Sequence, residues 1–212
     1  MKTGILFDLD GTLLDTLQDI AEAANHALEV LGYPRRSLEE MCSFVGNGAR
    51  VLLTRAAPAG ADVDKLLPEF HSYYRSHAQV KTAPYPGIME ALEKIRQRYP
   101  IAIVSNKPDP AVKLLCDHYF PGVYARGEST ECPRKPAPDM VFRAMEAIGV
   151  EHCIYVGDSE VDVETAKNAG MPCLSVLWGF REKADMEAVG AVYFCAEPAK
   201  LPEIIEEINH GK

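Results

Sequence analysis

The sequence predicts an α/β fold, in which a parallel β-sheet carries helices on both faces and one purely helical segment is inserted. After residue 87, short apolar runs alternate with stretches of helical periodicity, which is typical of parallel sheets. Between residues 16 and 82 the strand-like runs are absent and helical periodicity takes over. The chain has 212 residues, of which 47% are hydrophobic, so it is long enough for one such domain with a modest insertion.

The first element is a short apolar strand, residues 4–7, that leads directly into two carboxylates. Asp8 and Asp10 stand two residues apart where the strand ends, so both groups stay near one spot. Two anions this close raise each other's pKa unless a cation lies between them, and Mg²⁺ suits such oxygen ligands. Gly11 allows a sharp turn and lets backbone N–H groups approach an anion. For these few residues alone, an ordinary Asx turn is the alternative.

The inserted segment predicts a small module of helices. Its first helix has Asp15 or Thr16 as N-cap, carries an apolar face and ends at Gly32. Further helices are expected at residues 38–45, 49–57 and 62–78. Pro68 is expected to divide or kink the last of them, because proline lacks the N–H that a helix interior requires.

The second half of the chain predicts the rest of the sheet, after a boundary at residues 84–87. Strands are expected at residues 101–104, 123–125, 153–156 and 173–177, with a weaker one near 191–194. Helices are expected at residues 88–98, 110–118, 138–148 and 160–169, with a weaker one near 200–208. Because ligands of parallel sheets bind at the carboxyl ends of the strands, polar residues at those ends are candidates for a site.

Further polar groups stand at or near such strand ends. Ser105 and Asn106 follow a hydrophobic strand and offer a hydroxyl, an amide and backbone N–H groups to a phosphate oxygen. Asp158 follows another strand, and Asp162 stands about one helical turn later. Lys135 lies in a loop that two prolines stiffen, which fixes where its ammonium points. Taken singly, each group also fits an ordinary turn, a helix N-terminus or a solvated surface charge.

Residues 7–16, FDLDGTLLDT, resemble the first motif of the haloacid dehalogenase superfamily in its phosphatase form. The resemblance implies that Asp8 is a nucleophile that becomes an aspartyl-phosphate and that Asp10 is a general acid and base. The dehalogenases themselves lack the second aspartate, so Asp10 favours phosphoryl chemistry over carbon–halogen chemistry.

Three later motifs also resemble those of this superfamily, in the same order along the chain. The resemblance implies a Rossmann-like core and a Mg²⁺ cofactor, with Asp162 supporting the metal site or bracing the lysine. The metal ligands that it implies are the Asp8 side chain, the Asp10 backbone carbonyl and Asp158. The phosphate-binding residues that it implies are Gly11, Ser105, Asn106 and Lys135.

The inserted helices occupy the place of the superfamily's α-helical cap. We therefore expect a catalytic core of residues 1–15 and 83–212 and a cap domain of residues 16–82. His71 and His77 of the insertion are expected to be surface or packing residues. Tyr73 and Tyr74 are expected to pack the cap and not to contact the substrate.

Two short strings, together with the boundary at residues 84–87, resemble the phosphoglycolate phosphatase branch of the superfamily. They are residues 44–50, FVGNGAR, in the insertion and residues 178–181, WGFR, near the C-terminus. Asn47 and Arg50 in the first string are candidates for substrate selection, and Arg50 suits a substrate carboxylate. Arg134, beside the candidate lysine, is expected to be a solvent-exposed charge.

These motifs predict a Mg²⁺-dependent phosphatase that hydrolyses a small organic phosphate monoester through an aspartyl-phosphate, with 2-phosphoglycolate as first candidate. A pyrophosphatase and a β-phosphoglucomutase-like phosphoryl transferase of the same superfamily are alternatives. A non-catalytic binding module is the alternative from another class. A retired site should have lost one of its central groups, and Asp8, Asp10, Lys135 and Asp158 are all present.

Composition narrows the partners and the compartment. The net charge is −9 and lysine and arginine form no cluster, which argues against nucleic acid or an anionic membrane as partner. The six cysteines form no CxxC pair, so we expect reduced thiols and a cytoplasmic protein. No stretch has the length and apolarity of a signal peptide or a membrane span. A monomer or a homodimer that binds a small phosphate substrate is expected.

Overall fold

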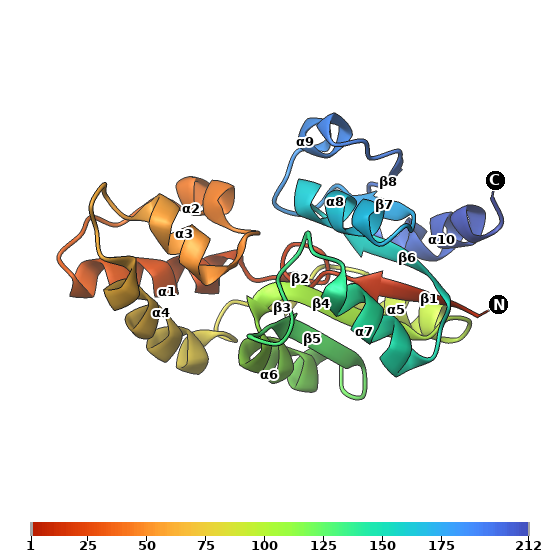
Figure 1. Cartoon of the computed structure of the whole chain (residues 1–212), viewed down its shortest axis with the longest axis horizontal. Coiled ribbons are helices and arrows are strands. Elements are labelled where there is room, and N and C mark those ends of the chain that lie inside the picture. The colour runs from red at the N-terminus through yellow and green to blue at the C-terminus, as the bar shows by residue number, and fades with distance from the viewer. Residues whose placement is uncertain (1, 212) are drawn as a thin grey trace.

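The computed structural model of the protein describes residues 2–211, and its centre is a six-stranded sheet whose neighbouring strands all run parallel (Figure 1). The strand order is β5 (Tyr124–Glu128), β4 (Ile101–Pro108), β1 (Thr3–Phe7), β6 (His152–Gly157), β7 (Cys173–Val176) and β8 (Tyr193–Cys195). Because β1 pairs with β4 on one side and with β6 on the other, the strands that carry most candidate site residues are neighbours. The predicted α/β fold is confirmed.

Helices cover both faces of this sheet. In β1, Ile5 and Phe7 belong to one buried cluster and Leu6 to another, because successive side chains of a strand alternate between faces. The first cluster includes α5 (Ile88–Arg96), α6 (Asp109–Tyr119) and α10 (Leu201–Asn209), which follows the 3₁₀ turn η1 (Pro198–Lys200). The second includes α7 (Asp139–Ile148), α8 (Glu160–Asn168) and α9 (Lys183–Ala188). Burial from both faces makes β1 a rigid base for the residues that follow it.

Four helices leave the sheet soon after β1 and lie to one side of it (Figure 1). They are α1 (Leu17–Val30), α2 (Leu38–Phe44), α3 (Gly48–Ala56) and α4 (Val63–His77). Two short antiparallel strands, β2 (Leu14–Asp15) and β3 (Ala83–Pro84), connect them to the sheet. We propose that residues 16–82 act as a cap domain on the rest of the chain, the core domain, and both names are used in this sense.

The buried carboxylate of Asp19 fastens the two ends of the cap together. It accepts hydrogen bonds from the N–H groups of Lys81 and Thr82 and from the Thr82 hydroxyl, at 2.8 to 3.0 Å. Tyr119 of the core domain donates to the Thr82 carbonyl at 2.6 Å. The start and the end of the cap are therefore tied to each other and to the core domain.

The structure differs from two sequence predictions about these elements, the division of a helix at Pro68 and the end of a strand at residue 104. α4 runs without interruption through Pro68, because Leu66, Phe70 and Tyr74 of the same helix are buried and their packing offsets one lost backbone hydrogen bond. β4 does not end at residue 104 but continues to Pro108, with an irregularity in its pairing with β5. Ser105 and Asn106 therefore lie within the strand and not in a turn after it.

The structure also bears on two predictions from composition, the state of the cysteines and the lack of a membrane span. All six cysteines are free thiols, and five of them are buried, as expected for small apolar side chains. Within residues 2–211, no helix combines the length and the apolarity that crossing a membrane would require.

Candidate active site

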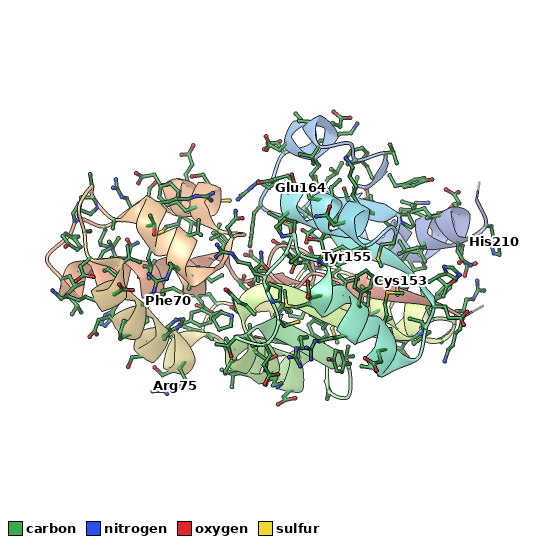
Figure 2. All side chains as sticks on the ribbon, viewed as in Figure 1. Phe70, Arg75, Cys153, Tyr155, Glu164 and His210 are labelled. Carbon is green, nitrogen blue, oxygen red and sulfur yellow. The ribbon has the colours of Figure 1, made fainter. Side chains whose placement is uncertain are left out.

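A cavity of about 60 Å³ lies where the carboxyl ends of β1 and β4 meet the cap domain. The polar residues of its wall come mostly from the core domain and include Asp8, Asp10, Ser105, Asn106 and Lys107. The apolar residues come mostly from the cap domain and include Ile20, Val45, Leu52 and Phe70. Figure 2 shows Phe70 among the cap helices and Tyr155 on the sheet side of the molecule.

Lys135 occupies the centre of a buried polar network on the core side. Its Nζ lies 2.8 Å from Asp8 Oδ1 and 2.7 Å from Asp162 Oδ1, and it donates to the Tyr155 hydroxyl at 3.1 Å. Only 2% of the lysine side chain is exposed, so its charge must be balanced inside the protein. The second oxygen of Asp162 accepts from the N–H groups of Asp158 and Ser159 and from the Ser159 hydroxyl. Asp162 thus holds both the lysine and the turn that carries Asp158.

Asp158 is held by two hydrogen-bond donors and by two glycines that pack against its carboxylate. Its two oxygens accept from the Thr12 hydroxyl at 2.9 Å and from the Phe180 N–H at 2.8 Å. A Cβ added at Gly11 or at Gly179 would collide with this carboxylate, so both positions need glycine. Gly11 also has φ +85°, a left-handed conformation that favours glycine.

The cluster of Asp8, Asp158, Asp162 and Lys135 holds more negative than positive charge. Burial raises the pKa of Asp8 well above its usual value. The attraction of Lys135 opposes this increase, and repulsion from Asp162 and Asp158 adds to it. Burial, together with Asp162, raises the pKa of Asp158 to about 7. When all three carboxylates are ionised, they and the one ammonium leave two negative charges in a buried place, which a divalent cation would neutralise.

The residues present therefore fit a hard divalent cation. Asp8, Asp158 and Asp162 offer carboxylate oxygens within 4.8 Å of one another, and carboxylates are the ligands that Mg²⁺ prefers. Asp162 Oδ2 already accepts three hydrogen bonds and its Oδ1 pairs with Lys135, whereas each oxygen of Asp158 accepts only one bond. Asp8 and Asp158 are therefore the better direct ligands.

Asp10 lies beside this cluster but has a lysine of its own. Its two carboxylate oxygens accept from Lys107 Nζ at 2.9 and 2.8 Å. The Lys107 side chain is 5% exposed, and its Nζ lies 4.9 Å from the centre of the Tyr74 ring of the cap domain. Burial alone would lower the pKa of Lys107, but the attraction of Asp10 outweighs this effect and raises the pKa above its usual value.

Two predicted phosphate-binding residues have other contacts in this structure. The two N–H bonds of the Asn106 amide go to the carbonyls of Gly46 and Lys135, and its oxygen accepts from the Lys135 N–H. These bonds leave Asn106 no side-chain donor for a phosphate, because both of its N–H groups are in use. The Gly11 N–H donates to the Leu14 carbonyl at 2.9 Å, so the evident contribution of Gly11 is its conformation.

The two cap residues proposed for substrate selection do not line the cavity. Arg50 is largely exposed and pairs with Asp64 at 2.7 Å. The Asn47 carbonyl accepts from Arg134 at 3.0 Å, so Arg134, although exposed, bridges the core and cap domains. Helix geometry explains why Arg50 does not line the cavity, because α3 presents Ala49 and Leu52 to the cavity and Arg50 to solvent.

Comparison with known proteins decides the family of this chain. The family described as haloacid dehalogenase-like hydrolase matches residues 5–176, which include all of the residues in the buried cluster. This chain belongs to the haloacid dehalogenase-like hydrolase family. The resemblance drawn from the sequence motifs is thereby confirmed, and the protein is an enzyme of the hydrolase class.

The relatives of this hydrolase include proteins named phosphoglycolate phosphatase. One from Rhodobacter capsulatus is 36% identical over 97% of this chain and 98% of its own length. Another from Pseudomonas putida is 37% identical over 87% of this chain and 72% of its own length. A crystal structure of a candidate phosphoglycolate phosphatase from Lactobacillus delbrueckii has a TM-score of 0.90 and 36% identity, covering 97% of this chain and 99% of that one.

Sequence reasoning missed two residues of this hydrolase's site. Lys107 directly follows Ser105 and Asn106. A lysine next to two other polar residues at a strand end could have marked it as a candidate site residue. Arg181 donates to the Cys42 and Val45 carbonyls of the cap domain, and its string was noticed for its resemblance alone. Both contacts join segments far apart in sequence, which periodicity and spacing do not reveal.

Proposed function

We propose that this hydrolase cleaves a small organic phosphate monoester, with 2-phosphoglycolate as first candidate. The observation that carries the proposal is the buried Asp8 carboxylate, which faces the cavity and lies beside Lys135 and a second carboxylate with which it could hold a metal. The names of the relatives support the substrate class. The small cavity supports a small leaving group, since about 60 Å³ corresponds to only a few water molecules.

In the first step, an Asp8 oxygen attacks phosphorus and the bond from phosphorus to the leaving oxygen breaks. Asp10, in the protonated form that this step requires, gives its proton to that oxygen, so the product is a neutral alcohol group. Lys135 balances negative charge on Asp8 and on the transferring phosphoryl group, and the Ser105 hydroxyl, which lines the cavity, binds a phosphoryl oxygen.

In the second step, water attacks the phosphorus of the aspartyl-phosphate, and Asp10, ionised since the first step, takes a proton from that water. The bond between Asp8 and phosphorus breaks, which releases inorganic phosphate and restores both aspartates. The cap domain covers the cavity with apolar side chains, so it limits the access of other water molecules during the first step.

Mg²⁺ would be held by the side chains of Asp8 and Asp158, with Asp162 bracing both the lysine and the Asp158 turn. When bound, it supplies positive charge at the phosphoryl oxygens. The Asp10 backbone carbonyl is a further proposed ligand, as the family resemblance implies. We also propose that the enzyme works in the cytoplasm, where its six free thiols stay reduced.

A panel of phosphate compounds tests the proposal. Purified protein with Mg²⁺ is assayed for phosphate release from 2-phosphoglycolate, ethyl phosphate, a hexose phosphate and pyrophosphate. We expect the highest kcat/KM with 2-phosphoglycolate and incorporation of label from a ³²P-ester into an acid-stable, hydroxylamine-sensitive protein adduct. Hydrolysis of pyrophosphate alone would replace this proposal by the pyrophosphatase alternative, and no phosphate release from any compound would refute it.

A further inference from the structure

Lys107 is a buried charged residue at the cavity that the reaction steps above do not use. It belongs to the core domain, and the cap residue Tyr74 packs against it from the opposite side. An ammonium has three N–H donors, and among residues 2–211 those of Lys107 make two hydrogen bonds, both to Asp10. The third donor faces Tyr74 and has no second carboxylate among these residues, so it can turn to a ligand in the cavity.

The Tyr74 hydroxyl is a second unused polar group at the same place. Only 4% of Tyr74 is exposed, and within the described part of the chain its hydroxyl oxygen has no hydrogen-bond partner. Burial raises the pKa of Tyr74 to about 12, so the phenol keeps its proton and can donate it. A buried hydroxyl without a partner costs free energy, and an acceptor atom of a bound ligand would remove that cost.

The cavity contains few other groups that could bind an anion. Among the described residues that line it, Lys107 is the only lysine or arginine. His71 is the other basic residue in the wall, and burial lowers its pKa. Arg50 is paired with Asp64 outside the cavity, and Lys135 is occupied by Asp8 and Asp162.

The position of Lys107 also limits where such an anion would lie in the substrate. In the proposed function, Asp10 must come within about 3 Å of the leaving oxygen to give it a proton. Lys107 Nζ is 2.8 Å from an Asp10 oxygen. A substrate group that binds Lys107 while Asp10 contacts the leaving oxygen is therefore only a few bonds away from that oxygen. A carboxylate on the neighbouring carbon satisfies this requirement, and so does a second phosphate.

We propose that Lys107 and the Tyr74 hydroxyl bind a negatively charged group on the leaving part of the substrate and so select esters that carry one next to the scissile bond. This inference rests on the proposed function and deepens it by assigning specificity to two residues. Lys107 belongs to the core domain and Tyr74 to the cap domain, so an anion that binds both residues connects the two domains.

The test compares two esters that differ in this charge. Lys107→Met is assayed with 2-phosphoglycolate and with ethyl phosphate, whose leaving group has the same carbon count but no charge. We expect kcat/KM for 2-phosphoglycolate to fall about 100-fold more than kcat/KM for ethyl phosphate. Lys113→Met is the matched control, since Lys113 is an exposed lysine that pairs with Asp109 and does not line the cavity.

Equal losses with both esters would overturn the inference, because they would mean that Lys107 acts only by positioning Asp10. Tyr74→Phe removes one oxygen atom and should lower the preference for 2-phosphoglycolate by about 5-fold. A loss of preference for pyrophosphate over ethyl phosphate in Lys107→Met would extend the recognised group from carboxylate to phosphate.

A measurement on the unaltered enzyme covers the case that Lys107→Met does not fold. Glycolate should inhibit ethyl phosphate hydrolysis at a concentration at least about 10-fold lower than ethylene glycol, which lacks the charge. Equal inhibition by the two compounds would overturn the inference while ester hydrolysis continues. If the unaltered enzyme hydrolysed neither ester with Mg²⁺, the proposed function would fail as well, so the two failures are distinguishable.

Discussion

The core and cap sides of the cavity contribute different kinds of residue and are held in different ways. On the core side, each charged group has several buried partners, as with Lys135 among Asp8, Asp162 and Tyr155. On the cap side the wall is mostly apolar, and a few hydrogen bonds to backbone carbonyls join it to the core, for example from Arg181 to Cys42.

We infer from this difference that the core side carries out the reaction and that the cap side selects the substrate. A network in which every member has several partners holds its geometry, whereas a wall attached by a few bonds can open and close at small cost. We therefore expect changes on the core side to affect every substrate alike. Changes on the cap side should depend on the substrate and on closure of the cap. The following predictions are ordered from the largest expected effect to the smallest.

Asp8→Asn should lower kcat by at least about 10⁴-fold with every phosphate ester, because the amide cannot act as the nucleophile. Since burial raises the pKa of Asp8, its ionised form is costly in the folded protein, so the metal-free variant should have an equal or higher Tm. Steady-state assays and thermal unfolding in EDTA measure the two effects. Substantial activity in a preparation free of wild-type enzyme would contradict the nucleophile assignment.

Removal of divalent metal by EDTA should lower activity by at least about 10³-fold, and Mg²⁺ should restore it. Burial raises the pKa of Asp158 to about 7, so the folded metal-free protein binds this proton more tightly than the unfolded chain. The stability of the metal-free protein therefore falls as the pH rises from about 4 to about 7.

Bound Mg²⁺ would compensate this loss by neutralising the ionised cluster. The difference in Tm between protein in Mg²⁺ and protein in EDTA should consequently widen as the pH is raised from about 5 to about 8. Thermal unfolding at several pH values measures it. A difference that stays constant or narrows over this range would argue against Asp158 as a ligand.

Arg181→Met should lower kcat/KM by about 10-fold by weakening the attachment of the cap domain. Arg181 donates to the Cys42 carbonyl at 2.9 Å and to the Val45 carbonyl, and it pairs with Glu160. Hydrogen exchange of residues 42–48 should become faster, while label incorporation at Asp8 persists. Lys183→Met, at an exposed lysine nearby, serves as control. Unchanged exchange in this loop would refute the attachment role.

Arg50→Ala should change kcat/KM for 2-phosphoglycolate by less than about 2-fold, because exposed ion pairs contribute little and Arg50 does not line the cavity. The same assay decides between Arg50 and Lys107 as the residue that binds the leaving group. A loss of about 10-fold or more in Arg50→Ala would show that the cap rearranges on substrate binding to bring Arg50 inside.

The sequence predicted the core side much better than the cap side. Asp8, Asp10 and Asp158 follow apolar strands at short and regular distances, so their meeting at one edge of the sheet follows from topology. The Arg50 prediction relied on a residue type alone, and whether a helical residue faces the cavity depends on how α3 is rotated against the core domain. Pro68 likewise does not divide α4, since packing of the helix outweighed a local preference.

The sequence by itself determined the α/β architecture, the inserted helices and which acidic groups stand at the strand ends, because periodicity and strand-end position are local properties of the chain. Only the tertiary structure decided that Lys107 pairs with Asp10 beneath Tyr74, that Asn106 braces the Lys135 loop, and that Arg181 holds the cap. Those contacts join residues far apart in sequence, and their free energy depends on burial and on hydrogen-bond geometry, which exist only after the chain has folded.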